Sequence, residues 1–317
     1  MSWVAVVHER QPAYACIGPD LEVVVVPGIG GKIVSIRSAR TGHDYVWRQP
    51  GRKLAPIEDG RTYADADISG LDDCFPTVDP CVVPGGSGDA HELREHGDVW
   101  HRSWHPTVIP PTLHLSSAGE ELPYRLSKGL TVRGPRLEVQ YRLRTDRPFR
   151  YQWTGHLLLR AAPGGRLRIH GHPVGRTSFA TGGRLVTDPD LRWTWPDVPS
   201  ADGSTVDLSV VEDAAVAVNE KVWLSSPPDG TARLECGAGA GDAVVTFDAD
   251  MLPWLAICVD YGGWPAAEPA HWVAIEPSTS NADALTDSMR GGTARTITPG
   301  ETHRWWWSLT IDDGAVA

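Results

Sequence analysis

Hydrophobic and polar residues alternate along much of this chain with a period of two. In RLEVQYRLRTD, residues 136–146, every second side chain from Leu137 to Leu143 is apolar, and those between them are charged or polar. Successive side chains of a β-strand point to opposite faces of its sheet. The pattern therefore predicts an antiparallel strand with one buried and one solvated face.

Further short runs are rich in β-branched and aromatic residues and are bounded by Gly, Pro, Asp and Ser, as strands joined by turns are. They are LEVVVVP (21–27), GKIVSIRS (31–38), LRIHG (167–171), DAVVTFD (242–248), LAICVDY (255–261), HWVAIEP (271–277) and HRWWWSLTI (303–311). These runs predict an all-β chain. VVVVPGIGGK, residues 23–32, has glycines like those of a dinucleotide-binding loop, but a strand follows it, so we predict a β-hairpin there.

Helix signals are rare, and the best one is STSNADALTDSMRGG, residues 278–292. Ser280 or Asn281 can cap its start, and Gly291 and Gly292 can end it. With 317 residues the chain could form two average domains, but all-β folds of this size often form one unit. We predict a single domain spanning residues 1–317.

Composition adds expectations about the location and partners of the protein. The first residues do not have the pattern of a signal peptide, and no run approaches the ~18 apolar residues of a membrane span, so we expect a cytoplasmic protein without membrane contact. The five cysteines are odd in number and scattered, which predicts reduced thiols, with Cys74 and Cys81 as the pair that could join. The net charge of -11 argues against nucleic acid as a partner. A monomer and a homodimer are both compatible with the sequence.

Between Glu58 and Asp98 eleven acidic residues stand against two arginines, which we interpret mainly as a solvated acidic loop region. Within it, HELREHGDVWHRSWH, residues 91–105, suggests a metal site at first sight. His91 and His96 are five residues apart, which places them ~140° apart on a helix and on opposite faces of a strand. Only an irregular loop would let them share an ion, and we predict no metal site. VWHRSWH, residues 99–105, is predicted as a strand.

Six segments, taken in order, resemble the aldose 1-epimerase (galactose mutarotase-like) family. They are VVPGIGGKIVSIRSARTGHDYVW (25–47), ISGLDDCFPTVDPC (68–81), HGDVWHRSW (96–104), YQWTGHLLLR (151–160), WVAIEPSTSNADAL (272–285) and ITPGETHRWWWSLTI (297–311). The resemblance implies a large two-sheet antiparallel β-sandwich of the galactose mutarotase-like supersandwich type, with an open cleft on one concave sheet. It also implies a small-molecule sugar as substrate and the interconversion of its α and β anomers.

That reaction takes the proton from the C1 hydroxyl while the ring oxygen is protonated, so one carboxylate and one imidazole suffice and no cofactor is expected. The resemblance implies Glu276 as the base, His156 as the acid, and His96 as a hydrogen-bonding group near the ring oxygen. Without the resemblance, Glu276 lies at the end of an apolar strand. A carboxylate at such a position is usually either paired with another polar group or functional. His156 precedes an apolar run and by itself is more typical of a core histidine.

Other sugar contacts are proposed at Asp72, Asp73 and Phe75, at Trp100, which can stack on a sugar ring, and at Lys221. Ordinary turn and surface roles are at least equally compatible with each. Members of the family that bind sugar phosphates carry an arginine where this chain has Ser69, so an unphosphorylated aldose is favoured. Two alternatives stay open: a carbohydrate-binding protein without catalysis, and a sugar-phosphate mutarotase with Arg48, Arg52 and Lys53 as its basic corner.

Overall fold

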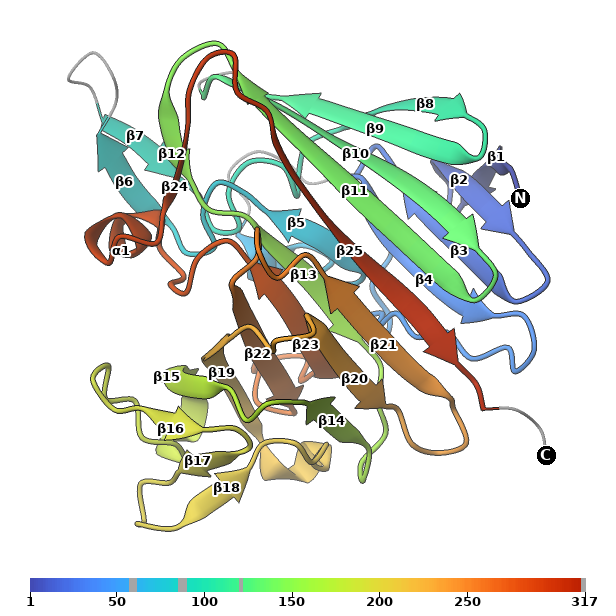
Figure 1. Ribbon diagram of the computed structural model, residues 1–317. Helices are drawn as coiled ribbons and strands as arrows, with labels where there is room; N and C mark the ends of the chain where they lie inside the picture. Colours follow the sequence, from blue (N-terminus) through green and yellow to red (C-terminus); the bar gives the residue numbers. More distant parts are fainter. Residues whose placement is uncertain (57–61, 85–89, 120–121, 315–317) are drawn as a thin grey trace.

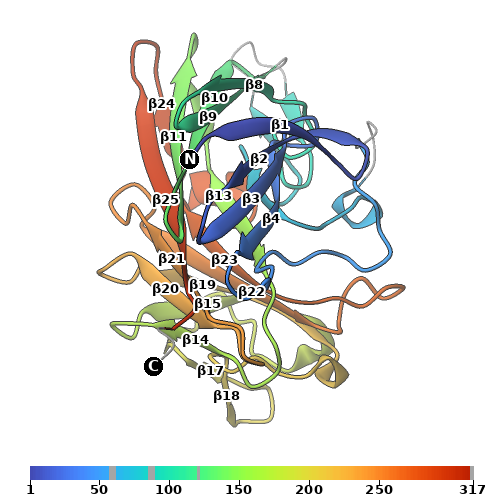
Figure 2. The same cartoon turned by 90° about the vertical axis from the view of Figure 1, so that its right-hand side faces the viewer.

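Two large antiparallel sheets pack against each other in the computed structural model, which describes residues 1–56, 62–84, 90–119 and 122–314. One sheet has eleven strands and the other has eight. They form separate layers, with β1 to β4 on one side of the turned view and β20, β21 and β25 on the other (Figures 1 and 2). The predicted all-β sandwich is confirmed.

The eleven-stranded sheet contains, in spatial order, β1 (Trp3–His8), β2 (Gln11–Ile17), β3 (Leu21–Val26), β4 (Lys32–Ser38), β5 (Leu71–Cys74), β13 (Thr154–Leu159), β23 (His271–Ser278), β22 (Trp254–Tyr261), β19 (Val218–Ser225), β15 (Val174–Ala180) and β16 (Trp193–Thr194). The eight-stranded sheet contains β14 (Arg166–Ile169), β20 (Thr231–Glu235), β21 (Asp242–Phe247), β25 (His303–Asp312), β11 (Arg136–Thr145), β10 (Tyr124–Arg133), β9 (Thr112–Ala118) and β8 (His105–Ile109).

Three two-stranded ribbons lie outside these sheets. They pair β6 (Cys81–Pro84) with β7 (Ala90–Leu93), β12 (Phe149–Tyr151) with β24 (Arg295–Ile297), and β17 (Asp197–Pro199) with β18 (Thr205–Asp207). The short helical elements are η1 (Tyr63–Asp65), η2 (Thr181–Gly183), η3 (Ala214–Val216) and α1 (Leu285–Arg290).

The alternation in the sequence accounts for the core between the sheets. On β11 the side chains of Leu137, Val139, Tyr141 and Leu143 are buried, whereas Arg142 and Arg144 are exposed. Trp153, Trp305 and Trp307 are buried in the same core, so part of the high tryptophan content serves packing between the sheets. The residues 23–32 form the predicted hairpin, since β3 pairs with β4.

The helix in residues 278–292 exists, but it begins later than predicted. Its first residue is Leu285, and its N-cap, Ala284, has no side-chain capping bond, so the prediction of Ser280 or Asn281 as the cap is wrong. The Ser280 hydroxyl instead donates to Ser288 at 2.7 Å, inside the fold. The predicted stop is confirmed, because Gly291 is the C-cap.

The prediction of a strand at residues 99–105 is wrong for all but its last residue. Residues 99–104 form turns and irregular backbone, and β8 begins only at His105. This segment packs on the hairpin turn before β4, where Gly30 N donates to Arg102 O at 2.8 Å. A Cβ at Gly30 would collide with the backbone of Trp100, so the close approach depends on glycine at that position.

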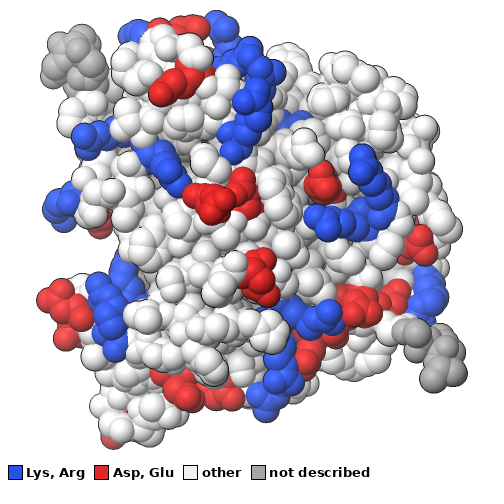
Figure 3. Space-filling view, viewed as in Figure 1, with Lys and Arg blue, Asp and Glu red and all other residues white. Residues whose placement is uncertain are grey.

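Charged residues of both signs lie next to one another on the face of the molecule that Figure 3 shows. Of the predicted acidic region, residues 58–61 and 85–89 lie outside the described residues. All five cysteines are free thiols. In the part of the chain that the structure describes, no helix has the length and apolar character needed to span a bilayer.

Candidate active site

Three polar side chains stand in a row on the face of the eleven-stranded sheet that points away from the core. Asp72 on β5 is paired with His156 on β13. On the other side of β13, Thr154 pairs with Ser278 and Leu157 with Ile275, which places His156 beside Glu276 of β23. Because side chains alternate along each strand, all three project from the same face. They are 3%, 6% and 1% exposed, respectively.

The His156 ring is held from behind by two oxygen atoms. Its Nδ1 lies 3.0 Å from Asp72 Oδ1 and 3.3 Å from the hydroxyl of Tyr63. The Tyr63 hydroxyl donates to the carbonyl of Ile68 at 3.1 Å. An ionised carboxylate can only accept, so His156 carries its Nδ1 proton toward Asp72 and leaves Nε2 free to exchange a proton with a ligand.

Asp72 is kept ionised by its neighbours. Burial by itself would raise the pKa of Asp72, but the Lys32 ammonium and the His156 hydrogen bond outweigh burial and lower the pKa from 3.8 to about 2. Lys32 Nζ lies 3.4 Å from Asp72 Oδ2 and donates to the carbonyl of Asp67 at 3.0 Å. Lys32 is fully buried, so this cation depends on Asp72 for its counter-charge.

His96 approaches the row from a turn rather than from a strand. Its backbone has φ of 57°, Gly97 follows with φ of 71°, and the turn is tied to Phe75 by Phe75 N donating to His96 O at 3.2 Å. The His96 ring lies 4.8 Å from the ring of His156 and 3.9 Å from that of Tyr63, measured between centroids. Burial, together with the nearby charge of His156, lowers the pKa of His96 well below its ordinary value, so His96 is neutral at neutral pH.

Glu276 is paired with a buried lysine on its other side. Lys221 Nζ, from β19, lies 2.8 Å from Glu276 Oε2 and 2.8 Å from Asp283 Oδ1. Asp283 also accepts from Ser178 and from Trp223 Nε1. Burial by itself would lower the pKa of Lys221, but Asp283 and Glu276 outweigh burial and raise it well above its ordinary value, so Lys221 stays cationic.

Several polar atoms of this region have no hydrogen-bond partner among the described residues. They are Asp72 Oδ2, His96 Nδ1, Glu276 Oε2 and Asp283 Oδ1. The three carboxylate oxygens among them are ion-paired with Lys32 or Lys221, at 2.8 to 3.4 Å. Buried polar atoms are rarely left unsatisfied, and their concentration here is what a site for a polar ligand requires.

Two of the predicted sugar contacts lie on the opposite face of the sheet. Asp73 is buried in the core, where it accepts from Lys128 at 2.7 Å and from the hydroxyl of Tyr141 at 2.7 Å. Phe75 is also fully buried and packs edge-on against Tyr124. Side chains along β5 and at Phe75, the residue after it, alternate between the two faces of the sheet. Asp73 and Phe75 therefore point to the face opposite that of Asp72, away from Glu276 and His156. The predictions for Asp73 and Phe75 are therefore corrected to core roles.

The other two predicted contacts do lie near the row but are engaged by protein groups. Trp100 is 1% exposed, donates from Nε1 to Glu95 O at 2.9 Å and meets Tyr63 edge-on at 5.2 Å between ring centroids. It forms part of the site wall and does not offer an open stacking face. Lys221 is committed to its two carboxylates, as described above.

The sequence analysis missed Lys32, Tyr63 and Asp283, which contact the predicted residues directly. Lys32 follows a Gly-Gly turn and Tyr63 precedes β5, and neither position has a local pattern that marks it. Asp283 lies near the start of the helix that the sequence predicts, where an acidic residue is common. For a metal, the described residues contain no group of three or more His, Cys, Asp or Glu placed to hold an ion. His91 lies on β7 and His96 in the turn that follows it.

No protein-family model matches the chain, and no curated protein matches its sequence. Solved structures do match. A Synechocystis protein has a TM-score of 0.70 at 15% identity, with 98% of this chain and 99% of the other covered. A galactose mutarotase related enzyme from Lactobacillus acidophilus has a TM-score of 0.67 at 14% identity, covering 94% and 97%. An Escherichia coli protein, provisionally named an aldose 1-epimerase, has a TM-score of 0.66 at 14% identity, covering 94% and 98%. The fold that the sequence resemblance implied is confirmed: this chain adopts the galactose mutarotase-like β-sandwich over almost its whole length.

Proposed function

We propose that the protein is a cofactor-independent aldose 1-epimerase that interconverts the α and β anomers of an unphosphorylated sugar. The observation that carries the proposal is the position of Glu276 and His156, which lie side by side on neighbouring strands. Close to His156 lies His96, whose buried Nδ1 has no hydrogen-bond partner among the described residues. Names given to structural neighbours, a galactose mutarotase related enzyme and a provisional aldose 1-epimerase, agree with it.

In the proposed reaction Glu276 accepts the proton of the anomeric hydroxyl, and His156 gives the proton on Nε2 to the ring oxygen. The bond between C1 and the ring oxygen breaks, and an open-chain aldehyde forms. Rotation about the C1–C2 bond and the reverse proton transfers close the ring as the other anomer. Asp72 holds the Nδ1 proton of His156 and stabilises the imidazolium that the reaction needs, as an orienting carboxylate does in other acid–base sites.

His96 supplies a neutral imidazole beside these two groups. Its Nδ1 has no partner among the described residues, and its ring lies next to that of His156. A neutral imidazole can donate with one nitrogen and accept with the other. It is therefore suited to hold the ring oxygen or a neighbouring hydroxyl without competing for the proton that His156 delivers.

The paired cations favour an unphosphorylated substrate. Of the three residues that were considered for a phosphate-binding corner, Arg48 lies 3.0 Å from Glu9 and Arg52 lies 2.9 Å from Glu268. A phosphate dianion would have to compete with these carboxylates for the guanidinium groups.

A carbohydrate-binding protein without turnover is the second candidate, and the ion pair at Glu276 favours it. The Lys221 ammonium lies 2.8 Å from Glu276 Oε2 and so occupies one side of the carboxylate that the proposed reaction uses as its base. The same pair would serve binding well, because it fixes both groups for hydrogen bonds to sugar hydroxyls.

Saturation-exchange NMR of anomer interconversion separates the two candidates. The wild type is tested with a panel of free aldoses and sugar phosphates, beside Glu276→Gln and a control with the same change on the surface, Glu235→Gln. Glu235 lies on β20 of the other sheet, where it pairs with Arg168. The proposal expects catalysed exchange of a free aldose in the wild type and the control, and none in Glu276→Gln.

Each other outcome has a definite meaning. Exchange that persists in Glu276→Gln contradicts the role given to this carboxylate. Ligand-induced shifts without exchange in the wild type support the binding protein instead. Exchange confined to sugar phosphates contradicts the substrate class proposed here.

A further inference from the structure

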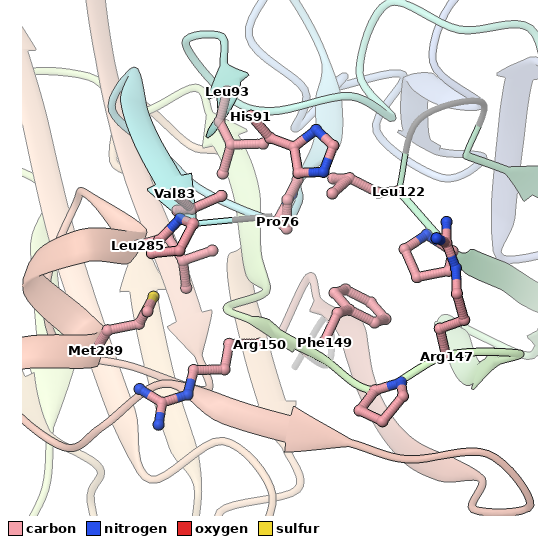
Figure 4. A pocket seen from close by; sticks show the side chains of 13 residues that line it. Pro76, Val83, His91, Leu93, Leu122, Arg147, Phe149, Arg150, Leu285 and Met289 are labelled. Carbon is pink, nitrogen blue, oxygen red and sulfur yellow. The ribbon is translucent and has the colours of Figure 1, made fainter. Parts of the chain in front are cut away.

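A cavity of about 350 Å³ lies outside the row of Asp72, His156 and Glu276. It is enclosed by the β6–β7 ribbon, α1, and the segment that leads into β12 (Figure 4). Most of its wall is apolar, and Val83, Leu93 and Leu285 belong to a small hydrophobic cluster of their own. The volume lies within the ~300–1,000 Å³ typical of small-molecule sites.

Two arginines and a histidine line this apolar cavity. Arg147 and Arg150 lie on either side of the Phe149 ring, and the His91 imidazole points inward between Leu93 and Leu122 (Figure 4). Both arginines are exposed. Elsewhere in the chain arginines are commonly paired, as Arg125 is with Asp146 at 2.6 Å. Within the described ranges, neither Arg147 nor Arg150 has a carboxylate partner.

We propose that this cavity binds a small anion with an apolar body, such as an aryl carboxylate or sulfonate. The apolar wall takes the ring or branched chain, and the guanidinium group of Arg147 or of Arg150, on opposite sides of Phe149, takes the charge at the rim. Guanidinium groups bind planar anions through paired N–H donors, so an anionic ligand suits this rim. An uncharged ligand would leave both arginines unused, and a small inorganic anion would leave the apolar wall in water.

The proposed site is separate from the proposed sugar site and does not depend on it. Leu93 ends β7, three residues before His96, and Leu285 begins α1, two residues after Asp283. The cavity therefore lies behind segments that reach the sugar site, but none of its lining residues belongs to the row itself. A change that removes only the chemistry at Glu276 should leave this cavity intact.

Fluorescence titration with two matched probes tests the proposal. Anilinonaphthalene sulfonate is an apolar anion, and N-phenylnaphthylamine is an uncharged compound of similar shape. The variants are Arg147→Gln/Arg150→Gln, which removes the charge, and Met289→Trp, which fills part of the cavity. Arg133→Gln/Arg304→Gln removes two exposed arginines from the eight-stranded sheet as a control. Glu276→Gln is a second control, because it changes the proposed sugar site but no residue that lines this cavity.

The expected result is saturable binding of one equivalent of the anionic probe to the wild type. Loss of charge-assisted hydrogen bonds should weaken it at least about tenfold in Arg147→Gln/Arg150→Gln, and Met289→Trp should weaken both probes. The surface control and Glu276→Gln should bind like the wild type. Binding of the anionic probe that is absent, or that is equally strong without Arg147 and Arg150, overturns the proposal. Displacement of the probe by inorganic sulfate as readily as by phenylacetate overturns the requirement for an apolar body.

Discussion

Asp72→Asn tests whether the charge at Asp72 holds Lys32 and His156 in the site. The substitution keeps the size of the side chain and its ability to accept a hydrogen bond, but it removes the negative charge. In the wild type that charge lies 3.4 Å from the fully buried Lys32 ammonium and 3.0 Å from His156 Nδ1. The variant therefore leaves a buried cation without its counter-charge.

The size of the effect follows from the pKa of Asp72. A fall from 3.8 to about 2, in which the Lys32 and His156 interactions outweigh the opposing effect of burial, corresponds to about 2 kcal/mol of stabilisation at neutral pH. Leaving one partner of a buried ion pair alone typically costs ~3–5 kcal/mol. We expect Asp72→Asn to lower the free energy of unfolding at pH 7 by about 2 to 5 kcal/mol.

Urea unfolding at a series of pH values measures both the size and the origin of this loss. Because the pKa of Asp72 is lowered in the folded state, its contribution is fully present above about pH 4 and disappears as the pH falls through about 2. The gap between wild type and variant should therefore close over that window. In the double variant Lys32→Met/Asp72→Asn both charges are gone, and it should be more stable than the single variant.

Two results would refute this reasoning. One is a gap of less than about 1 kcal/mol at pH 7, which is below the effect expected for a buried charge. The other is a gap that stays the same size down to about pH 2, which would show that packing rather than charge at Asp72 is responsible.

Three further substitutions test the ion pairs of Lys221, the turn at Gly97 and the buried carboxyl group of Asp260. Lys221→Met leaves the carboxylates of Glu276 and Asp283 without a cation, so the free energy of unfolding in urea should fall by ~3–5 kcal/mol. An unfolding midpoint equal to that of the wild type would show that these ion pairs do not stabilise the fold. Gly97→Ala places a Cβ against the Phe75 carbonyl at a φ of 71°, so both melting temperature and anomer exchange should fall, and an unchanged melting curve would count against a strained turn. Burial raises the pKa of Asp260 to about 7, despite three backbone N–H groups. Its ionisation thus weakens the fold as the pH rises from about 4 through 7, so Asp260→Asn should be more stable than the wild type at pH 8, and an advantage of equal size at pH 4 would contradict this.

The strands could be predicted because their information is local. The alternation in β11 needs no other part of the chain to indicate which side chains are buried, and the structure buries the predicted set. The same alternation wrongly predicted a strand at residues 99–104, because the backbone of this segment bonds to another part of the chain instead of to a neighbouring strand. Gly30 donates to Arg102 O, and the positive φ values of His96 and Gly97 turn the chain just before this segment. An alternating pattern cannot reveal such contacts.

The candidate site was predicted only in part for a related reason. Glu276 and His156 lie in segments that the family resemblance identifies, and the sheet register brings them together. The Asp72–Asp73 pair shows what the sequence could not provide. Two adjacent residues of a strand must face opposite sides, but which one faces the site depends on the register of β5 against β13. The resemblance does not mark Lys32, and the prediction of Lys221 as a sugar contact did not include its ion pairs with Glu276 and Asp283.

The distribution of charge around the site gives a physical reason to expect a neutral ligand. Lys32 pairs with Asp72, and Lys221 lies between Glu276 and Asp283, so each buried cation already has a carboxylate beside it. A phosphate would bring up to two more negative charges next to the carboxylates of Asp72, Glu276 and Asp283, and like charges in a buried site repel strongly. A sugar hydroxyl brings no net charge, and it can donate to Glu276 Oε2 or Asp72 Oδ2, the acceptors that lack a hydrogen bond. The charges that hold this site together thus favour an uncharged ligand, as the proposed function requires.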